Sequence, residues 1–238
     1  MSKVTLALVK ASLELADNER SKISEREKDI FGLTSIKVRA LLNNLCSKEN
    51  TNYLEIGVYK GATIISALAG NNKTKAVGVE NFSYDDREPK KHAPKGEIWE
   101  NMKSQLYSNI DRYKDPDSGV NTDNINIIEE NFKSVDWSST PKFDLCFFDI
   151  SPVTDKDYDA FFENTLTAML PQSVVIFTNY SNDLHANQLN DALSKHSDKV
   201  DIQWKEQRIS SGLSDSTHYY SGICIVGIKK KVVKAKNA

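Results

Sequence analysis

The sequence predicts an α/β protein whose core is a seven-stranded, mostly parallel sheet with an antiparallel final strand, helices on both faces and an N-terminal helical extension. Two patterns support this prediction. From residue 53 onward, short apolar runs alternate with stretches of helical periodicity, which is typical of parallel strands joined by helices. The last two apolar runs are separated only by a polar stretch, so they can pair as a hairpin. At 238 residues, the chain is long enough to bury one sizeable core.

The first 48 residues predict the helical extension. Two apolar stripes recur there with approximate helical spacing, one between Leu6 and Leu15 and the other between Ile36 and Leu45. Between them, Ser24 to Glu27 resemble the charged first turn of a helix, and Gly32 is a plausible break. We therefore expect an extension at 1–48, an α/β domain at 49–229 and a basic, disordered tail at 230–238.

The strands and helices of the α/β domain are assigned from apolar runs of four to seven residues and from the helical patterns between them. The expected strands are 53–56, 75–79, 124–128, 143–149, 173–178, 200–204 and 222–228. The expected helices are 61–70, 97–109, 156–169 and 183–196. The final strand follows the polar stretch 207–221, which favours an antiparallel strand at or near the sheet edge.

Two long connections follow strands, at 83–96 and 210–221. The first comes at the carboxyl ends of the strands, where open α/β sheets bind ligands. Long connections in compact domains are often lids over a site, and an ordinary surface loop is an equally good interpretation.

Composition excludes several classes of protein. No apolar run approaches the roughly 18–20 residues that a membrane span requires, and the first residues lack a secretory signal. Cys46, Cys146 and Cys224 are odd in number, far apart and in apolar surroundings, which indicates free thiols in a reducing, cytoplasmic compartment. Net charge is −2, and five lysines gather in the last ten residues, so the rest of the chain is more acidic. An acidic body argues against a nucleic-acid partner.

The most informative segment begins at Asn52 and ends at Glu80. An apolar strand enters a glycine turn at Gly57, a helix follows, and a second strand ends on the Glu80 carboxylate, which can bind a ribose diol. A dinucleotide fingerprint needs a second glycine two residues after the first, but Tyr59 occupies that position. S-adenosylmethionine carries a ribose without a pyrophosphate and does not need that glycine. The pattern therefore favours a methyl-donor site over a nicotinamide site.

From residue 52 to about 228 the chain resembles the class I S-adenosylmethionine-dependent methyltransferases of small bacterial and phage type. The stretch Leu54-Glu55-Ile56-Gly57-Val58-Tyr59-Lys60-Gly61 is similar to the first motif of that family. The resemblance implies a Rossmann-like sheet of seven strands with an antiparallel last strand. It also implies methyl transfer from S-adenosylmethionine to an acceptor that the sequence does not identify, either a small molecule or a glycan-type compound.

The resemblance assigns cofactor-binding roles to several residues. Gly57 and Gly61 would shape the turn beneath the methionine half of the cofactor, and Glu55 would lie near its ammonium, bridged by water. Glu80 would accept hydrogen bonds from the ribose hydroxyls. A cationic ligand gives a physical reason for a carboxylate at Glu55, although local pairing on the strand is the alternative for Glu55 and a surface position is the alternative for Glu80.

Other positions carry weaker assignments. Tyr59 and Thr63 stand near the start of a helix, where free N–H groups favour a carboxylate, and ordinary packing explains Tyr59 equally well. Asn131 and Phe132 follow the third strand, in the region that flanks adenine in the family. A helix-start turn accounts for both residues as well.

Asp149 ends the fourth strand, where the transferred methyl group should lie, so we expect it to bind the cofactor and to act in catalysis. A loop-capping role is the alternative. Metal-dependent O-methyltransferases place an acid pair after strand five, but this chain has Thr178-Asn179 there, so no metal site is predicted. The histidine that often follows the strand-four acid is also missing from 151–154.

The remaining histidines, His185, His196 and His218, are more often structural or surface residues, and His218 in the late loop is the best substrate-side candidate. A methyltransferase-fold binding protein without turnover is the alternative function, motivated by Thr178-Asn179 and the missing base. We expect a small-molecule acceptor, no nucleic acid and no membrane partner. The N-terminal helices offer a surface for a homo-oligomer or a lid.

Overall fold

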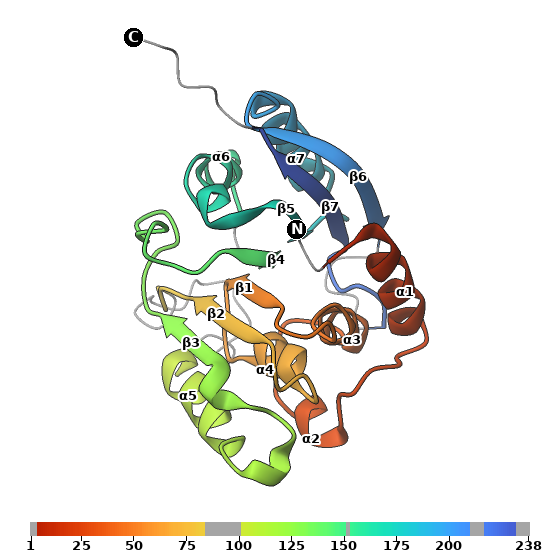
Figure 1. Ribbon diagram of the computed structural model, residues 1–238, viewed down its shortest axis with the longest axis vertical. Coiled ribbons are helices and arrows are strands. Elements are labelled where there is room, and N and C mark those ends of the chain that lie inside the picture. The colour runs from red at the N-terminus through yellow and green to blue at the C-terminus, as the bar shows by residue number, and fades with distance from the viewer. Residues whose placement is uncertain (1–3, 84–100, 151–152, 210–216, 232–238) are drawn as a thin grey trace, which may run out of the picture.

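The computed structural model describes residues 4–83, 101–150, 153–209 and 217–231 (Figure 1). Within these ranges seven strands form one sheet in the order β3-β2-β1-β4-β5-β7-β6. Their bounds are β1 (Asn52–Ile56), β2 (Lys75–Val79), β3 (Ile125–Ile128), β4 (Phe143–Phe148), β5 (Met169–Thr178), β6 (Val200–Arg208) and β7 (Ile223–Lys230). The pairs from β3 to β5 are parallel, whereas β7 runs antiparallel to both β5 and β6. The predicted fold class is confirmed, with the antiparallel strand next to the edge strand.

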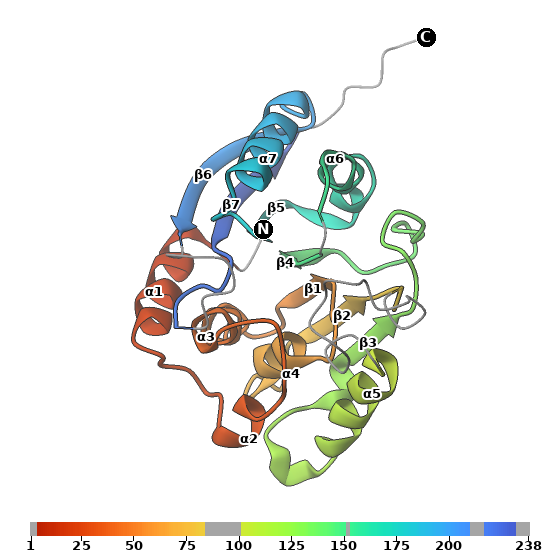
Figure 2. The same cartoon turned by 180° about the vertical axis from the view of Figure 1, so that it is seen from behind.

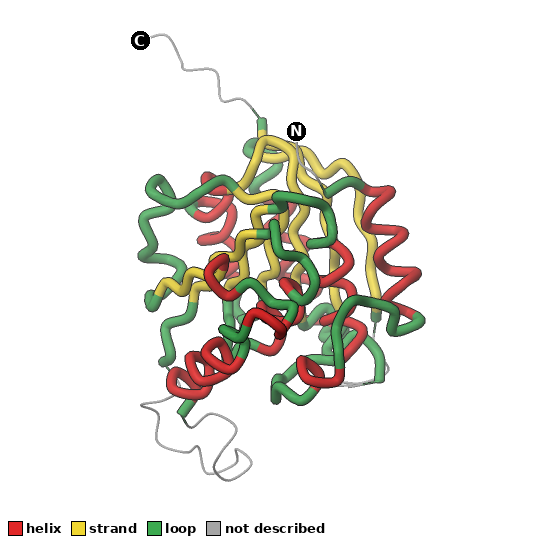
Figure 3. The backbone as a smooth tube through the Cα atoms, turned by 60° about the horizontal axis from the view of Figure 1, so that its bottom comes forward, coloured by secondary structure: helices red, strands yellow, loops and turns green. Residues whose placement is uncertain are grey.

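Helices cover both faces of this sheet (Figures 1 and 2). One face packs against α1 (Leu6–Asp17), α3 (Ile36–Leu45), α4 (Ala62–Leu68) and α5 (Met102–Arg112), with the short α2 (Glu25–Lys28) before α3. The other packs against α6 (Asp155–Glu163) and α7 (Asp183–Lys195). Figure 3 shows the strands running between these helices. Neighbouring residues of each strand point to opposite faces, so Tyr53 joins the first core and Leu54 the second.

Aromatic packing fixes α6 against the second face. Phe148, Phe161 and Phe177 come from β4, α6 and β5, and their ring centroids lie 5.4–5.7 Å apart in edge-to-face pairs. Such pairs are each worth about 0.5–1.5 kcal/mol beyond the area they bury. Since these strands are adjacent, the cluster holds their carboxyl ends in a fixed relation.

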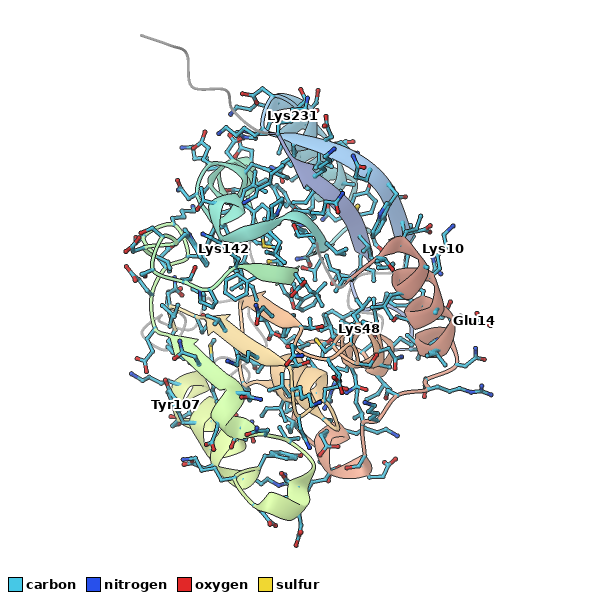
Figure 4. The ribbon with its side chains drawn as sticks, in the orientation of Figure 1. Lys10, Glu14, Lys48, Tyr107, Lys142 and Lys231 are labelled. Carbon is cyan, nitrogen blue, oxygen red and sulfur yellow. The ribbon has the colours of Figure 1, made fainter. Side chains whose placement is uncertain are left out.

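The predicted N-terminal extension forms part of the first face of the core. Arg39 is buried, and its Nε donates to Ser66 Oγ of α4 at 2.8 Å. Asn43 Nδ2 donates to the carbonyls of Ser66 and Ala69, both at 2.8 Å. Lys10 and Glu14 project outward from the exposed side of α1 (Figure 4). The oligomer surface or lid expected of these helices stays a prediction.

The predicted helix at 156–169 was too long. The helix α6 ends at Glu163, a 3-10 turn η3 (Thr165–Ala168) follows, and β5 begins at Met169 instead of residue 173. The strand contains Pro171, which cannot donate a ladder hydrogen bond. It is accommodated because the β4–β5 register shifts between Phe143↔Met169 and Leu145↔Val174, which leaves the proline in an irregularity of the ladder.

The other boundaries differ by smaller amounts. The helices predicted at 61–70 and 97–109 are α4 and α5, and residues 97–100 lie outside the described residues. The strand predicted at 200–204 continues to Arg208, and β7 continues to Lys230, the first residue of the expected tail. Further 3-10 turns are η1 (Pro116–Ser118) and η2 (Thr122–Asn124). Among the described residues, every helix is too short or too polar to cross a membrane.

Candidate functional site

A cavity of about 660 Å³ opens at the carboxyl ends of β1, β2, β4 and β5. This is the edge at which open α/β sheets bind their ligands. The main lining segments are 32–34, 56–59, 79–81, 130–132, 149–150, 178–179 and 219–223. The cavity therefore combines the turn after β1 with segments from the two ends of the chain.

The turn after β1 depends on Gly57. Its φ is +87°, a left-handed conformation that favours glycine, and a Cβ there would lie 1.9 Å from the Asp149 carbonyl oxygen. The Gly57 N–H donates to the Val79 carbonyl at 3.0 Å, and the Asp149 N–H donates to the Ile56 carbonyl at 2.8 Å. These contacts bring the ends of β1, β2 and β4 together. Gly61, with a φ of +88°, precedes α4 and lies outside the cavity lining.

Glu80 lies directly after β2 and faces the same turn. Its Oε2 accepts the Tyr59 N–H at 2.9 Å, and its Oε1 accepts the Phe82 N–H at 3.2 Å. A carboxylate has about four lone-pair positions, so two remain for a ligand that brings hydroxyl donors. Tyr59 itself has a φ of 55°, an unusual conformation for a bulky residue, and its side chain lines the cavity.

Glu55 lies beneath the cavity and does not line it. The carboxyl is fully buried, accepts the Thr63 hydroxyl at 2.5 Å and also accepts the Tyr53 hydroxyl. Burial raises the pKa of Glu55 to about 8; the two hydrogen bonds oppose this rise and the charges of Asp149 and Glu80 add to it. Thr63 lines the cavity and lies between Glu55 and the open space.

Asp149 and Asn179 stand at the ends of the neighbouring strands β4 and β5. Asp149 Oδ1 accepts the Thr178 hydroxyl at 2.7 Å, and Asn179 Nδ2 donates to Thr178 Oγ1 at 3.1 Å. Burial raises the pKa of Asp149 to about 6, the Thr178 hydrogen bond lowers it, and the charge of Glu80 raises it. The structure therefore places in the cavity a carboxyl that is mostly ionised at neutral pH and titrates slightly below it.

Asn131 and Phe132 both line the cavity, and both also have local roles. Asn131 Oδ1 accepts the Lys133 N–H at 3.0 Å, which closes the turn after β3. Phe132 packs edge to face on Phe148 at 5.5 Å. Asn131 and Phe132 therefore occupy a turn and also line the cavity.

The histidines of the described chain lie outside the cavity lining. His196 is buried, stacks on Phe162 and lies 2.9 Å from Asp159, which is a structural role. His218 is exposed, while its neighbours Tyr219 and Tyr220 line the cavity. Within the described ranges, no group of three or more metal-ligating side chains could hold a metal ion.

Sequence reasoning missed the wall formed by residues 32–34. Gly32 was interpreted only as a helix break, but a Cβ there would lie 2.6 Å from the Ala62 Cβ. This close approach brings Leu33 and Thr34 to the cavity. The glycine was the available signal, and its meaning depends on a contact that the sequence does not show.

The cavity has a marked charge asymmetry. Four carboxylates line it, from Glu80, Glu130, Asp149 and Asp157, and that of Asp157 is paired with Lys133 at 2.5 Å. Among the described residues, the lining contains no lysine, arginine or histidine. Such a site favours a cationic ligand and disfavours one that carries phosphate groups.

Structural comparison identifies the fold. The chain is similar to the O-methyltransferase TomG from Streptomyces achromogenes in complex with SAM, at 16% identity, with 96% of this chain and 92% of that chain covered and a TM-score of 0.51. It is also similar to TYW2 of M. jannaschii in complex with AdoMet, at 15% identity, with 83% and 76% covered and a TM-score of 0.53. A third is a putative methyltransferase from Thermoplasma acidophilum, at 16% identity, with 77% and 69% covered and a TM-score of 0.51. No protein-family model and no curated protein matches the sequence. The chain has the class I methyltransferase fold.

Proposed function

We propose that this protein transfers a methyl group from S-adenosylmethionine to a small-molecule acceptor. The observation that supports this most is the acidic cavity at the carboxyl ends of β1, β2, β4 and β5. S-adenosylmethionine carries a sulfonium and an ammonium, and the lining carboxylates of Glu80, Glu130 and Asp149, which have no cationic partner among the described residues, match its positive charges. TomG and TYW2, which share the fold, have structures in complex with this cofactor.

The residues present fit this cofactor. Glu80 has two remaining acceptor positions for a ribose diol, and the Gly57 turn lets a ligand approach the backbone closely. A nicotinamide dinucleotide fits less well. Its pyrophosphate needs a close approach to the backbone two residues after Gly57, where Tyr59 replaces the second glycine of the dinucleotide motif and lines the cavity.

The protein's contribution to methyl transfer is mainly positional. S-adenosylmethionine supplies a methyl group on a sulfonium, which a nucleophile takes by in-line displacement. Glu80 and the Gly57 turn would hold the nucleoside, and the walls at 32–34 and 219–223 would restrict water. Asp149 lines the cavity directly after β4 and would accept a proton from the nucleophile.

Calorimetry tests the proposal directly. S-adenosylmethionine and S-adenosylhomocysteine are titrated into the protein, with NADH as the matched control, and product formation is then followed by mass spectrometry. We expect saturable binding of both sulfur compounds and none of NADH. Absence of binding by either sulfur compound would contradict the proposal. Tight binding without a methylated product from any acceptor tested would favour a catalytically silent binding protein.

We also propose a reducing, cytoplasmic location. All three cysteines are buried and free, and burial raises the pKa of Cys224 to about 12 and that of Cys46 further. Thiols in this state are unreactive and form no disulfide, which suits a reducing compartment.

A further inference from the structure

Two side-chain oxygens at the ends of β4 and β5 have no hydrogen-bond donor among the described residues. Asp149 Oδ1 accepts from Thr178, whereas its Oδ2 has no donor among the described residues. Asn179 directs its Nδ2 to Thr178 Oγ1 and to the Ile150 carbonyl, so its Oδ1 also has no donor among those residues. Both residues line the cavity. A ligand that satisfies these oxygens must bring N–H or O–H donors.

Two tyrosines held in an unfavourable backbone conformation line the same cavity. Tyr59 and Tyr220 both have a φ of 55°, in the left-handed region that bulky residues rarely adopt. Tyr59 comes from the turn after β1 and Tyr220 from the segment before β7, and both line the one cavity. Strain of this kind persists where surrounding structure enforces it, often at ligand sites. The faces of aromatic rings attract cations.

Two lysines lie close to the cavity without lining it: Lys60 is beside the Tyr59 ring, and Lys133 pairs with the lining carboxylate of Asp157 at 2.5 Å. Lys60 Nζ lies 5.2 Å from the Phe31 ring centroid and 5.1 Å from that of Tyr59, and the side chain is buried outside the cavity lining. The described lining thus combines carboxylates and aromatic rings, and it contains no lysine, arginine or histidine. Within the part of the lining that the structure describes, an anionic acceptor would meet negative charge without a cationic side chain to offset it.

We propose that the methyl acceptor is an amine, bound as a small organic cation by Asp149, Asn179 and the tyrosine rings, and methylated on nitrogen. This inference rests on the proposed methyltransferase function. It narrows the acceptor to one chemical class, and it assigns Asn179, Tyr59 and Tyr220 to recognition of that acceptor.

Asp149 can accept the proton that the bound ammonium must lose before its nitrogen is methylated. The ammonium gives one proton to the Asp149 carboxylate, and the freed nitrogen lone pair forms the N–CH3 bond as the S–CH3 bond breaks and leaves its electron pair on sulfur. A second positive charge about 4 Å away makes an ammonium about a thousandfold more acidic at an effective dielectric constant of about 20. The neighbouring sulfonium therefore assists the proton transfer. Glu80, Glu55 and Thr178 are the groups that face Asp149 from β2, β1 and β5.

Binding of matched probes tests the inference without turnover. The protein is saturated with S-adenosylhomocysteine and titrated calorimetrically at neutral pH with tyramine, 4-ethylphenol and 3-(4-hydroxyphenyl)propanoate, and then with hexylamine, 1-hexanol and hexanoate. We expect at least one amine to bind about tenfold more tightly than its neutral and anionic partners, the scale of a charged hydrogen bond. Equal or tighter binding by a neutral or anionic probe, or no binding by either amine, overturns the inference.

Variants separate recognition from folding. With the protein saturated with S-adenosylhomocysteine, Asp149→Asn should weaken tyramine binding about tenfold and leave binding of the neutral 4-ethylphenol nearly unchanged. Tyr220→Leu should weaken amine binding more than Tyr220→Phe does, because phenylalanine keeps the aromatic ring. Equal effects of the two Tyr220 variants would overturn the aromatic contact. If S-adenosylhomocysteine itself fails to bind, the proposed function fails; if it binds and the amines do not, only the amine inference fails.

Discussion

Replacing Glu55 with glutamine should remove the part of the pH dependence of stability near neutral pH that this carboxyl contributes. The Glu55 carboxyl is fully buried between the Tyr53 and Thr63 hydroxyls, and its pKa is raised from 4.5 to about 8. Glutamine has nearly the same shape and stays uncharged at every pH. Because the two hydroxyls can rotate to donate or accept, the substitution changes hydrogen bonding by an amount that does not vary with pH.

The sign and size of the Glu55 contribution to the free energy of unfolding follow from proton linkage. Between about pH 4.5 and 8 the unfolded state holds fewer protons on Glu55 than the folded state does, so stability falls as pH rises across this window. At 1.36 kcal/mol per pH unit, flattening as pH passes the folded pKa, the loss between about pH 6 and 8.5 is about 2–3 kcal/mol. The contribution is fully present below the unfolded pKa and is lost above the folded one.

Urea unfolding of the cofactor-free protein measures this pH-dependent contribution of Glu55 to stability. The free energy of unfolding is determined for wild-type protein and Glu55→Gln at several pH values from about 6 to 8.5. The difference between the two proteins isolates Glu55, because all other titrating groups are common to both. We expect this difference to move by about 2–3 kcal/mol in favour of the glutamine variant as pH rises. Parallel stability curves would show that Glu55 is already ionised in the folded protein at pH 6 and would refute the reasoning.

Three further predictions concern the cavity. Glu80→Ala should weaken binding of S-adenosylmethionine by about 1–3 kcal/mol, measured by calorimetry; a folded variant of unchanged affinity would exclude a ribose contact. Gly57→Ala should lower the free energy of unfolding by more than about 2 kcal/mol, because the new Cβ meets the Asp149 carbonyl oxygen at 1.9 Å. Its control, Gly119→Ala, has a similar φ of +72° with no atom within 4 Å and should cost only about 1 kcal/mol. Thr178→Val removes the donor that lowers the pKa of Asp149, so the acidic limb of the pH–rate profile should move to higher pH. An unmoved limb would mean that Asp149 does not control it.

Most of the fold was predictable from the sequence because the signals are local. The apolar runs of β1, β2 and β4 and the polar stretch before β7 each identify an element within a few residues. The failure at 156–169 has a definite cause. A proline three residues into β5 argues against a strand, and only the shifted register opposite Phe143 makes room for it. Pairing between distant strands decides such a boundary, and no local window contains that information.

The cavity lining likewise contains one part that follows from local sequence and one part that does not. Gly57 and Glu80 belong to one strand–turn–helix–strand unit, so their approach follows from the chain order alone. The second part consists of the walls at 32–34 and 219–223, which are separated by most of the chain. Each is attached by a glycine: a Cβ at Gly32 would meet Ala62, and a Cβ at Gly222 would lie 2.1 Å from Ser181 Oγ. The shape of this part of the cavity therefore depends on two packing contacts between distant segments, which no sequence motif records.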